Sequence, residues 1–335
     1  MILSLLALSC FALSLVATRV VLGWLRHRQI LDLPNERSSH TRPTPRGGGL
    51  AVTPVALVGL LAAALVDGAL PATTVAVPAA CALLVLSWVD DRRSLSARLR
   101  LGVHLLAVAA VLATLPADRL VFQGLLPLAL DRVITALAWG WFINLYNFMD
   151  GIDGITGVET ASLGLGLALA GTLAGAGGYS APGIVLAAVA VGFLIFNWHP
   201  AKLFMGDSGS VPLGFLLGWL LVLAATDGLW APALILPLYY LADATITITR
   251  RALRGERIWQ AHRQHFYQRA AARLGHAPVS LAVLGCNLLL VASAALALFH
   301  PLAGLAAGAG TVALFLAGLG RWAGPGSSAA SAPTR

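Results

Sequence analysis

The sequence predicts an all-α fold: a polytopic transmembrane helical bundle of about eleven spans, with a periplasmic N-terminus and a cytoplasmic C-terminus. Composition is the first observation, because 58% of the 335 residues are hydrophobic and 11% are charged, whereas soluble domains carry about a quarter charged residues. The second is that apolar runs of the roughly 20 residues needed to cross a bilayer recur along the chain. The third is the placement of the basic residues, which sets the orientation.

Eleven apolar segments have the length of a membrane span. They cover residues 2–25, 48–66, 72–89, 100–115, 131–148, 155–175, 182–197, 208–226, 229–249, 278–299 and 301–320. The first lacks a basic n-region and a small-residue cleavage site, so we expect a retained helix rather than a signal peptide. A further apolar stretch, 120–130, is too short to span and contains Pro127, which predicts a re-entrant or interfacial segment.

We expect a single membrane domain over residues 1–323. The tail, 324–335, consists mainly of Ser, Ala, Pro and Gly, a composition typical of disorder.

Basic residues are concentrated in alternate loops. One set of loops includes seven arginines between Arg250 and Arg273, whereas the opposite set has only Arg119 and Arg132. The positive-inside rule places the first set in the cytoplasm. This placement accounts for the net charge of +8, so nucleic acid is not an expected partner. The loops rich in Asp, His, Asn and Gly fall on the same side, which gathers the polar chemistry on one membrane face.

Three acidic motifs stand at the ends of the predicted spans. They contain Asp90 and Asp91, then Asp150 and Asp153, then Asp207. Ionisable groups at membrane depth are costly and are therefore functional candidates. Neighbouring carboxylates repel one another, and a hard divalent cation removes that repulsion. Mg²⁺ is the expected ion, because it combines one or two carboxylates with waters and substrate phosphates. A lone Asp-Gly is more often a turn, but three such motifs on one face favour a site.

Two basic motifs could complete this site. The first, "RSSHTRPTPRGGG", contains His40, Arg42 and Arg46, and arginine forks match phosphate oxygens; an ordinary positive-inside loop is the alternative. The second contains His262 and His265, which share a face if the segment is helical. Two histidines without a nearby Cys or carboxylate make a weak zinc motif. We prefer contacts to a nucleotide or sugar phosphate, with an amphipathic surface helix as the alternative.

Five motifs together resemble the polyprenyl-phosphate N-acetylhexosamine-1-phosphate transferases, of the glycosyltransferase family 4 type. They are "DLPNERSSHTRPTPRGGG", "DDRRSL", "NLYNFMDGIDGI", "NWHPAKLFMGDSGS" and "HRQHFYQR", in family order. This family includes the enzymes that start peptidoglycan, teichoic-acid and O-antigen lipid intermediates. The last motif is unlike the triple-histidine form of the muramoyl-pentapeptide transferases and is closer to that of the O-antigen-initiating enzymes.

The resemblance implies roles for individual residues. Asp90 and Asp91 correspond to the catalytic pair, and Asp207 to the principal Mg²⁺ ligand, with Asp150 and Asp153 on the metal and nucleotide side. The implied substrate-binding residues are Asn147, Asn197, Lys202, His262, Arg263, His265, Arg42, Arg46 and His40.

The resemblance also implies a reaction. An N-acetylhexosamine-1-phosphate would pass from a UDP-N-acetylhexosamine to undecaprenyl phosphate, with Mg²⁺ as cofactor, Mn²⁺ as a substitute, and UMP as the second product. The implied sugar is N-acetylglucosamine or a deoxy-N-acetylhexosamine. The implied location is the bacterial inner membrane, with the active site on the cytoplasmic face, and a homodimer remains open. Two alternatives are a secondary transporter, which usually shows repeat symmetry and a midplane site, and a lipid phosphatase, which needs a nucleophile with Arg and His.

Overall fold

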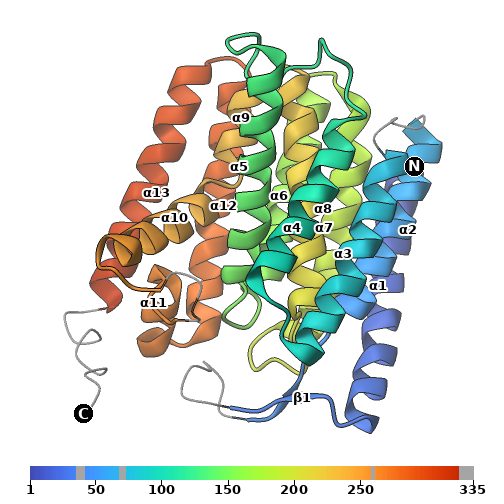
Figure 1. The fold of residues 1–335 in the computed structure, drawn as a ribbon, viewed down its shortest axis with the longest axis vertical. Coiled ribbons are helices and arrows are strands. Elements are labelled where there is room, and N and C mark those ends of the chain that lie inside the picture. The colour runs from blue at the N-terminus through green and yellow to red at the C-terminus, as the bar shows by residue number, and fades with distance from the viewer. Residues whose placement is uncertain (35–41, 68–72, 258–259, 261, 324–335) are drawn as a thin grey trace.

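The computed structural model describes residues 1–34, 42–67, 73–257, 260 and 262–323. Within them the chain forms an elongated bundle of long helices with the irregular segments gathered at its ends (Figure 1). The α-helices are α1 (Ile2–His27), α2 (Gly49–Asp67), α3 (Thr73–Arg93), α4 (Ala97–Leu112), α5 (Leu128–Phe148), α6 (Ile155–Leu173), α7 (Ser180–Asn197), α8 (Asp207–Thr226), α9 (Trp230–Ile235), α10 (Leu238–Leu253), α11 (Phe266–Leu274), α12 (His276–Ala297) and α13 (Pro301–Ala323). A short 3₁₀ helix, η1 (Gly177–Tyr179), precedes α7.

The helices confirm a polytopic, mainly α-helical membrane protein. Among the described residues, seven helices are long and apolar enough to cross a bilayer: α1, α3, α5, α7, α8, α12 and α13. The other predicted spans correspond to α2, α4, α6 and the pair α9 and α10. The number of crossings and the membrane side of each terminus remain predictions. In Figure 1, α1 starts at the upper end of the bundle and α13 finishes at the lower end.

Helix α8 is the buried centre of the bundle. In its most apolar stretch 89% of residues are buried, compared with 22% in α1 at the periphery. Glycines allow this packing, because a Cβ at Gly49 of α2 would overlap the backbone of Ser208 and Gly209. Membrane helices use small residues in this way to bring their backbones together. The start of α8 is thereby fixed against the start of α2.

The structure differs from the sequence-based prediction in two places, and it adds detail to the short apolar stretch 120–130. The predicted span 229–249 is broken at Pro237 into α9 and α10, and α10 runs obliquely to the other helices (Figure 1). Residues 120–127 form turns, and the buried Asp131 of α5 accepts the backbone N–H groups of Val121 and Phe122. The all-α prediction also missed two short antiparallel strands, β1 (Leu31–Asp32) and β2 (Thr44–Pro45).

The predicted domain 1–323 stays a prediction, and the predicted tail 324–335 lies outside the described residues.

Candidate active site

Four carboxylates lie near one another where three helices have their polar ends. Asp90 and Asp91 occupy the last turn of α3, Asp150 follows α5, and Asp207 is the first residue of α8. These ends lie on the lower side of the bundle in Figure 1, close to strands β1 and β2. Asp90, Asp91, Asp150 and Asp207 are called the acidic cluster below.

Asp91 closes the N-terminus of α8. Its carboxylate accepts the backbone N–H groups of Asp207 at 3.2 Å and Ser208 at 3.1 Å. Those N–H groups have no partner within the helix, and the helix dipole favours a negative charge there. Gly206, which precedes the helix, has φ +72°, and a Cβ on it would lie 3.0 Å from Asp91 Oδ2. Glycine is therefore required for the close approach of α3 to α8.

Two arginines neutralise the cluster. Arg46 Nη2 lies 2.7 Å from Asp207 Oδ1 and 3.0 Å from Asp91 Oδ1. Arg100 Nη1 lies 2.8 Å from Asp90 Oδ2 and 3.7 Å from Asp207 Oδ2. Arg100 reaches Asp90 because α3 turns back into α4 just after Arg93, and the backbone N–H of Leu95 donates to Asp90 Oδ1 at 2.6 Å. Asp207 therefore faces both guanidinium groups.

Asp150 belongs to the cluster electrostatically. Burial raises the pKa of Asp150, and the nearby carboxylates of Asp207 and Asp91 raise it further. A hydrogen bond from Thr156 and the charge of Arg46 lower it in part, which leaves the pKa at about 6. Burial alone would lower the pKa of Arg46, but the carboxylates of Asp207 and Asp91 outweigh it and raise that pKa. The cluster thus holds more negative charge than its neighbours balance at neutral pH.

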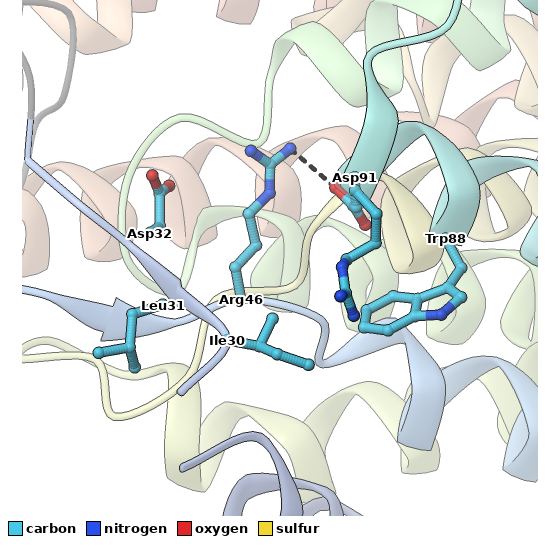
Figure 2. A pocket seen from close by; sticks show the side chains of 7 residues that line it. Ile30, Leu31, Asp32, Arg46, Trp88 and Asp91 are labelled. Carbon is cyan, nitrogen blue, oxygen red and sulfur yellow. Dashed lines mark ion pairs between the residues drawn. The ribbon is translucent and has the colours of Figure 1, made fainter. Parts of the chain in front are cut away.

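A small hollow of about 120 Å³ opens beside the Arg46–Asp91 pair. Figure 2 shows Arg46 between Asp32 of β1 and Asp91, with Trp88 and Ile30 on the apolar side. The guanidinium of Arg92 also lines the hollow, and its Cζ lies 5.5 Å from the centroid of the Trp88 ring. The hollow therefore combines cationic groups with an aromatic wall next to the acidic cluster.

A model of glycosyl transferase family 4 matches residues 73–225, which contain the whole acidic cluster. The chain is 30% identical over 253 residues to a probable undecaprenyl-phosphate N-acetylglucosaminyl 1-phosphate transferase of Bacillus subtilis, covering 72% of this chain and 70% of that protein. It belongs to glycosyl transferase family 4.

Two further relatives carry other names. A decaprenyl-phosphate N-acetylglucosaminephosphotransferase of Mycolicibacterium smegmatis is 35% identical over 237 residues, which cover 61% of this chain and 56% of that protein. A phospho-N-acetylmuramoyl-pentapeptide-transferase of Synechococcus sp. (strain WH7803) is 32% identical over 279 residues, which cover 74% of each chain. The chain is accordingly a membrane transferase of this family.

Asp153, predicted beside the metal, lies in a different set of contacts. Its Oδ2 is 2.6 Å from His199 Nδ1 and its Oδ1 is 3.2 Å from His276 Nδ1. Burial would raise its pKa, but the hydrogen bonds with His276 and His199 outweigh burial and lower it. Asp153 therefore pairs with two histidines, whereas the acidic cluster pairs with two arginines.

A buried carboxylate holds the loop that carries His262 and His265. Asp243 of α10 accepts the backbone N–H groups of Phe266 and Tyr267 and lies 3.1 Å from His265 Nδ1. His265 is 1% exposed and stacks on the ring of His262. In this transferase His265 therefore caps α11, whereas His262 is partly accessible.

The remaining predicted residues fall into two groups. Asn147 belongs to the site, because its side-chain amide donates to Asp207 Oδ2 at 3.3 Å and its carbonyl oxygen accepts from Ser210. Asn197 is buried and joins two loops, accepting from Gly154 N–H and donating to Leu203 O. The side chains of three further predicted residues are exposed: Arg42, Lys202 and Arg263. His40 lies outside the described residues.

Sequence reasoning missed several residues of these sites. Arg100, Thr156 and Ser210 contact the acidic cluster or Asn147 directly. Arg100 could have been noticed as a basic residue in the first turn of the helix that follows the aspartate pair. His199 stood inside the quoted motif "NWHPAKLFMGDSGS", but His276 carried no signal, because only the folded chain brings α12 to the loop after α5.

Proposed function

We propose that this transferase moves N-acetylhexosamine-1-phosphate from a UDP-sugar onto undecaprenyl phosphate, releasing UMP. The convergence of the acidic cluster with Arg46 and Arg100 at one end of a membrane bundle carries the proposal. Its relatives include proteins named as transferases onto undecaprenyl and decaprenyl phosphate. Family membership favours a transferase over a transporter or a lipid phosphatase.

The donor set suits Mg²⁺. Asp207 together with Asp150 and Asp91 offers carboxylate oxygens, the ligands that this hard cation prefers, and the amide of Asn147 orients one oxygen of Asp207. Bound Mg²⁺ would act as a Lewis acid that neutralises phosphate oxygens, and Mn²⁺ would substitute. Asp153 fits this ion poorly, because both of its carboxylate oxygens lie within hydrogen-bonding distance of imidazoles.

The chain's own residues then supply binding and proton transfer. Arg46 and Arg100 can exchange their carboxylate partners for phosphate oxygens, which their planar guanidinium groups match. Asp90 would accept the proton of the lipid phosphate where that proton is present. Because the second pKa of a phosphate monoester lies near 6, the base contributes modestly, and positioning of the two phosphates contributes more.

The remaining assignments follow from orientation and motif. The active site would face the cytoplasm at the inner membrane, where a water-soluble UDP-sugar meets a lipid whose tail needs the bilayer. His262 and Arg263 would contact the sugar or diphosphate, with Arg42, Lys202 and His40 on the same side. The proposed sugar is N-acetylglucosamine or a deoxy-N-acetylhexosamine, used to start O-antigen or another envelope polysaccharide.

Product formation by purified protein in detergent tests the proposal. We expect UMP release only with both undecaprenyl phosphate and Mg²⁺, and a panel of UDP-N-acetylsugars identifies the donor. Asp207→Asn should abolish turnover while the protein stays folded, whereas Asp227→Asn, at the other end of α8, should not. UMP release without the lipid acceptor, or normal turnover of Asp207→Asn, would contradict the proposal.

The reaction is proposed as a single displacement, in which the lipid phosphate oxygen attacks the β-phosphorus. Quenching a mixture of enzyme and radiolabelled UDP-sugar before the lipid is added tests this order. A phosphosugar attached to Asp90 or Asp91 would show a two-step route instead.

A further inference from the structure

Three side chains from distant parts of the chain meet at the loop between α5 and α6. Asp153 lies in the loop between α5 and α6, His199 follows α7, and His276 begins α12. One donor atom from each lies within 4.8 Å of the others. Asp153, His199 and His276 are called the Asp153 triad below.

The donor types of the triad differ from those of the acidic cluster. Two imidazole nitrogens with one carboxylate suit Zn²⁺ and similar transition ions, whereas an all-oxygen set suits Mg²⁺. Three protein ligands with one open position are the pattern of zinc sites that keep a water ligand. The side chain of His199 is 44% exposed, so an ion can reach the site from that side. The side chains of Asp153 and His276 are 7% and 9% exposed and form its buried side.

The spacing of the donors is close to that of a coordination sphere. Ligands at 2.0–2.2 Å from a tetrahedral ion lie about 3.4 Å from one another. The Nδ1 atoms of His276 and His199 lie 3.2 Å and 2.6 Å from the two oxygens of Asp153. The buried pair therefore already has nearly the required spacing, and the exposed His199 is the one that must move outward.

Further contacts hold the carboxylate in place. The backbone N–H of Ala201 donates to Asp153 Oδ2 at 3.1 Å, and Ser280 of α12 donates to the backbone carbonyl of Asp153 at 2.8 Å. Such outer contacts orient metal ligands. They also tie α12 to the loop that carries Asp150, three residues before Asp153.

We propose that the Asp153 triad is a second metal site, for a Zn²⁺-class transition ion, which fastens the loop between α5 and α6 to α12. The site is separate from the proposed Mg²⁺ site and does not depend on the proposed reaction. An ion there joins three chain segments, so it stabilises the fold around Asp150 without taking part in phosphate chemistry.

Metal binding to tag-free, chelator-stripped protein in detergent tests this site. Zn²⁺ is titrated calorimetrically and by thermal unfolding, and Co²⁺ is titrated for the visible absorption of a nitrogen-ligated ion. We expect one equivalent of Zn²⁺ to bind and raise the unfolding temperature. His199→Gln and His276→Gln should each weaken binding by more than the roughly 10–100-fold typical of losing an outer-shell partner. His300→Gln, at an exposed histidine between α12 and α13, is the matched control.

The same titration with Asp207→Asn distinguishes the Asp153 triad from the acidic cluster, because Zn²⁺ should still bind to this variant. Loss of Zn²⁺ binding in Asp207→Asn with retention in His199→Gln would place the ion at the acidic cluster and overturn the proposal. Absence of stoichiometric binding would overturn it too, since the triad would then be a hydrogen-bonded group alone. If His276→Gln fails to fold, His199→Gln still decides, because its side chain is exposed.

Discussion

Replacing Arg46 by Gln tests the charge balance of the site most directly. In the structure its guanidinium contacts Asp91 at 3.0 Å and Asp207 at 2.7 Å. A hydrogen bond to a charged group contributes about 1.5–3 kcal/mol, which gives a gross loss of about 3–6 kcal/mol. Because the Arg46 side chain is 38% exposed, solvent screening reduces this to about 2–3 kcal/mol. We expect Arg46→Gln to be less stable than wild type by that amount in EDTA.

Mg²⁺ should reduce the difference. If the ion neutralises the carboxylates that Arg46 neutralises, removal of the arginine strengthens Mg²⁺ binding, and each tenfold gain in affinity restores about 1.4 kcal/mol. Thermal and denaturant unfolding of detergent-solubilised protein, with EDTA and with saturating Mg²⁺, measures this. Equal stabilisation of variant and wild type by Mg²⁺ would refute the reasoning.

Arg119→Gln is the matched control for this experiment. Arg119 pairs with Asp227 beyond the C-terminal end of α8, about 30 Å from Asp207 at a rise of 1.5 Å per residue. An exposed pair of this kind contributes about 0–1 kcal/mol. Its loss should be small and independent of Mg²⁺.

Three further outcomes follow from buried or crowded positions. The folded protein holds the Asp150 proton more tightly than the unfolded chain does, so stability falls as pH rises from 3.8 to about 6. Asp150→Asn should therefore unfold at a higher temperature than wild type at pH 7.5 in EDTA. Below pH 4 the variant should lose that advantage. Asp243→Asn should lower the free energy of unfolding by about 1.5–3 kcal/mol through weaker contacts at the start of α11. It should also raise KM for the UDP-sugar more than it lowers kcat. An unchanged KM would show that this loop does not bind the donor. Gly49→Ala should destabilise by more than about 3 kcal/mol through overlap with the backbone of α8, whereas Gly23→Ala, with open space around it, should be tolerated in the same unfolding assay.

Hydropathy predicted the helices well because each span must bury its backbone polar groups within itself. The break at Pro237 was missed for a related reason. A window average reports how apolar a segment is, and 229–249 stays apolar across the proline, although proline removes one helical hydrogen bond and clashes with the preceding turn. The turns at 120–127 depend on the buried Asp131, whose contact with Val121 and Phe122 is a tertiary property.

The acidic cluster was predictable to a large extent because its members lie in short motifs at the ends of spans. Asp153 shows the limit of that reasoning. It stands three residues from Asp150 in the sequence, yet its carboxylate faces His199 and His276. His276 lies 123 residues further along the chain, so no local pattern could associate it with Asp153. Asp243 is similar, because its carboxylate accepts backbone N–H groups at the start of α11, and the sequence does not show that these two segments meet.

The proposed function requires an acidic site to bind two acidic substrates, and the charges of the site allow this. Four carboxylates in the cluster face two guanidinium groups, Arg46 and Arg100, so the group carries a charge of −2 when all four acids are ionised. One bound divalent cation would cancel that charge. The arginines would then be free to pair with phosphate oxygens, and the phosphates would enter a neutral site instead of a negative one. On this argument Arg100→Gln should weaken binding of a phosphorylated substrate in the presence of Mg²⁺. In EDTA, where Arg100 is engaged with Asp90, the same change should mainly lower stability.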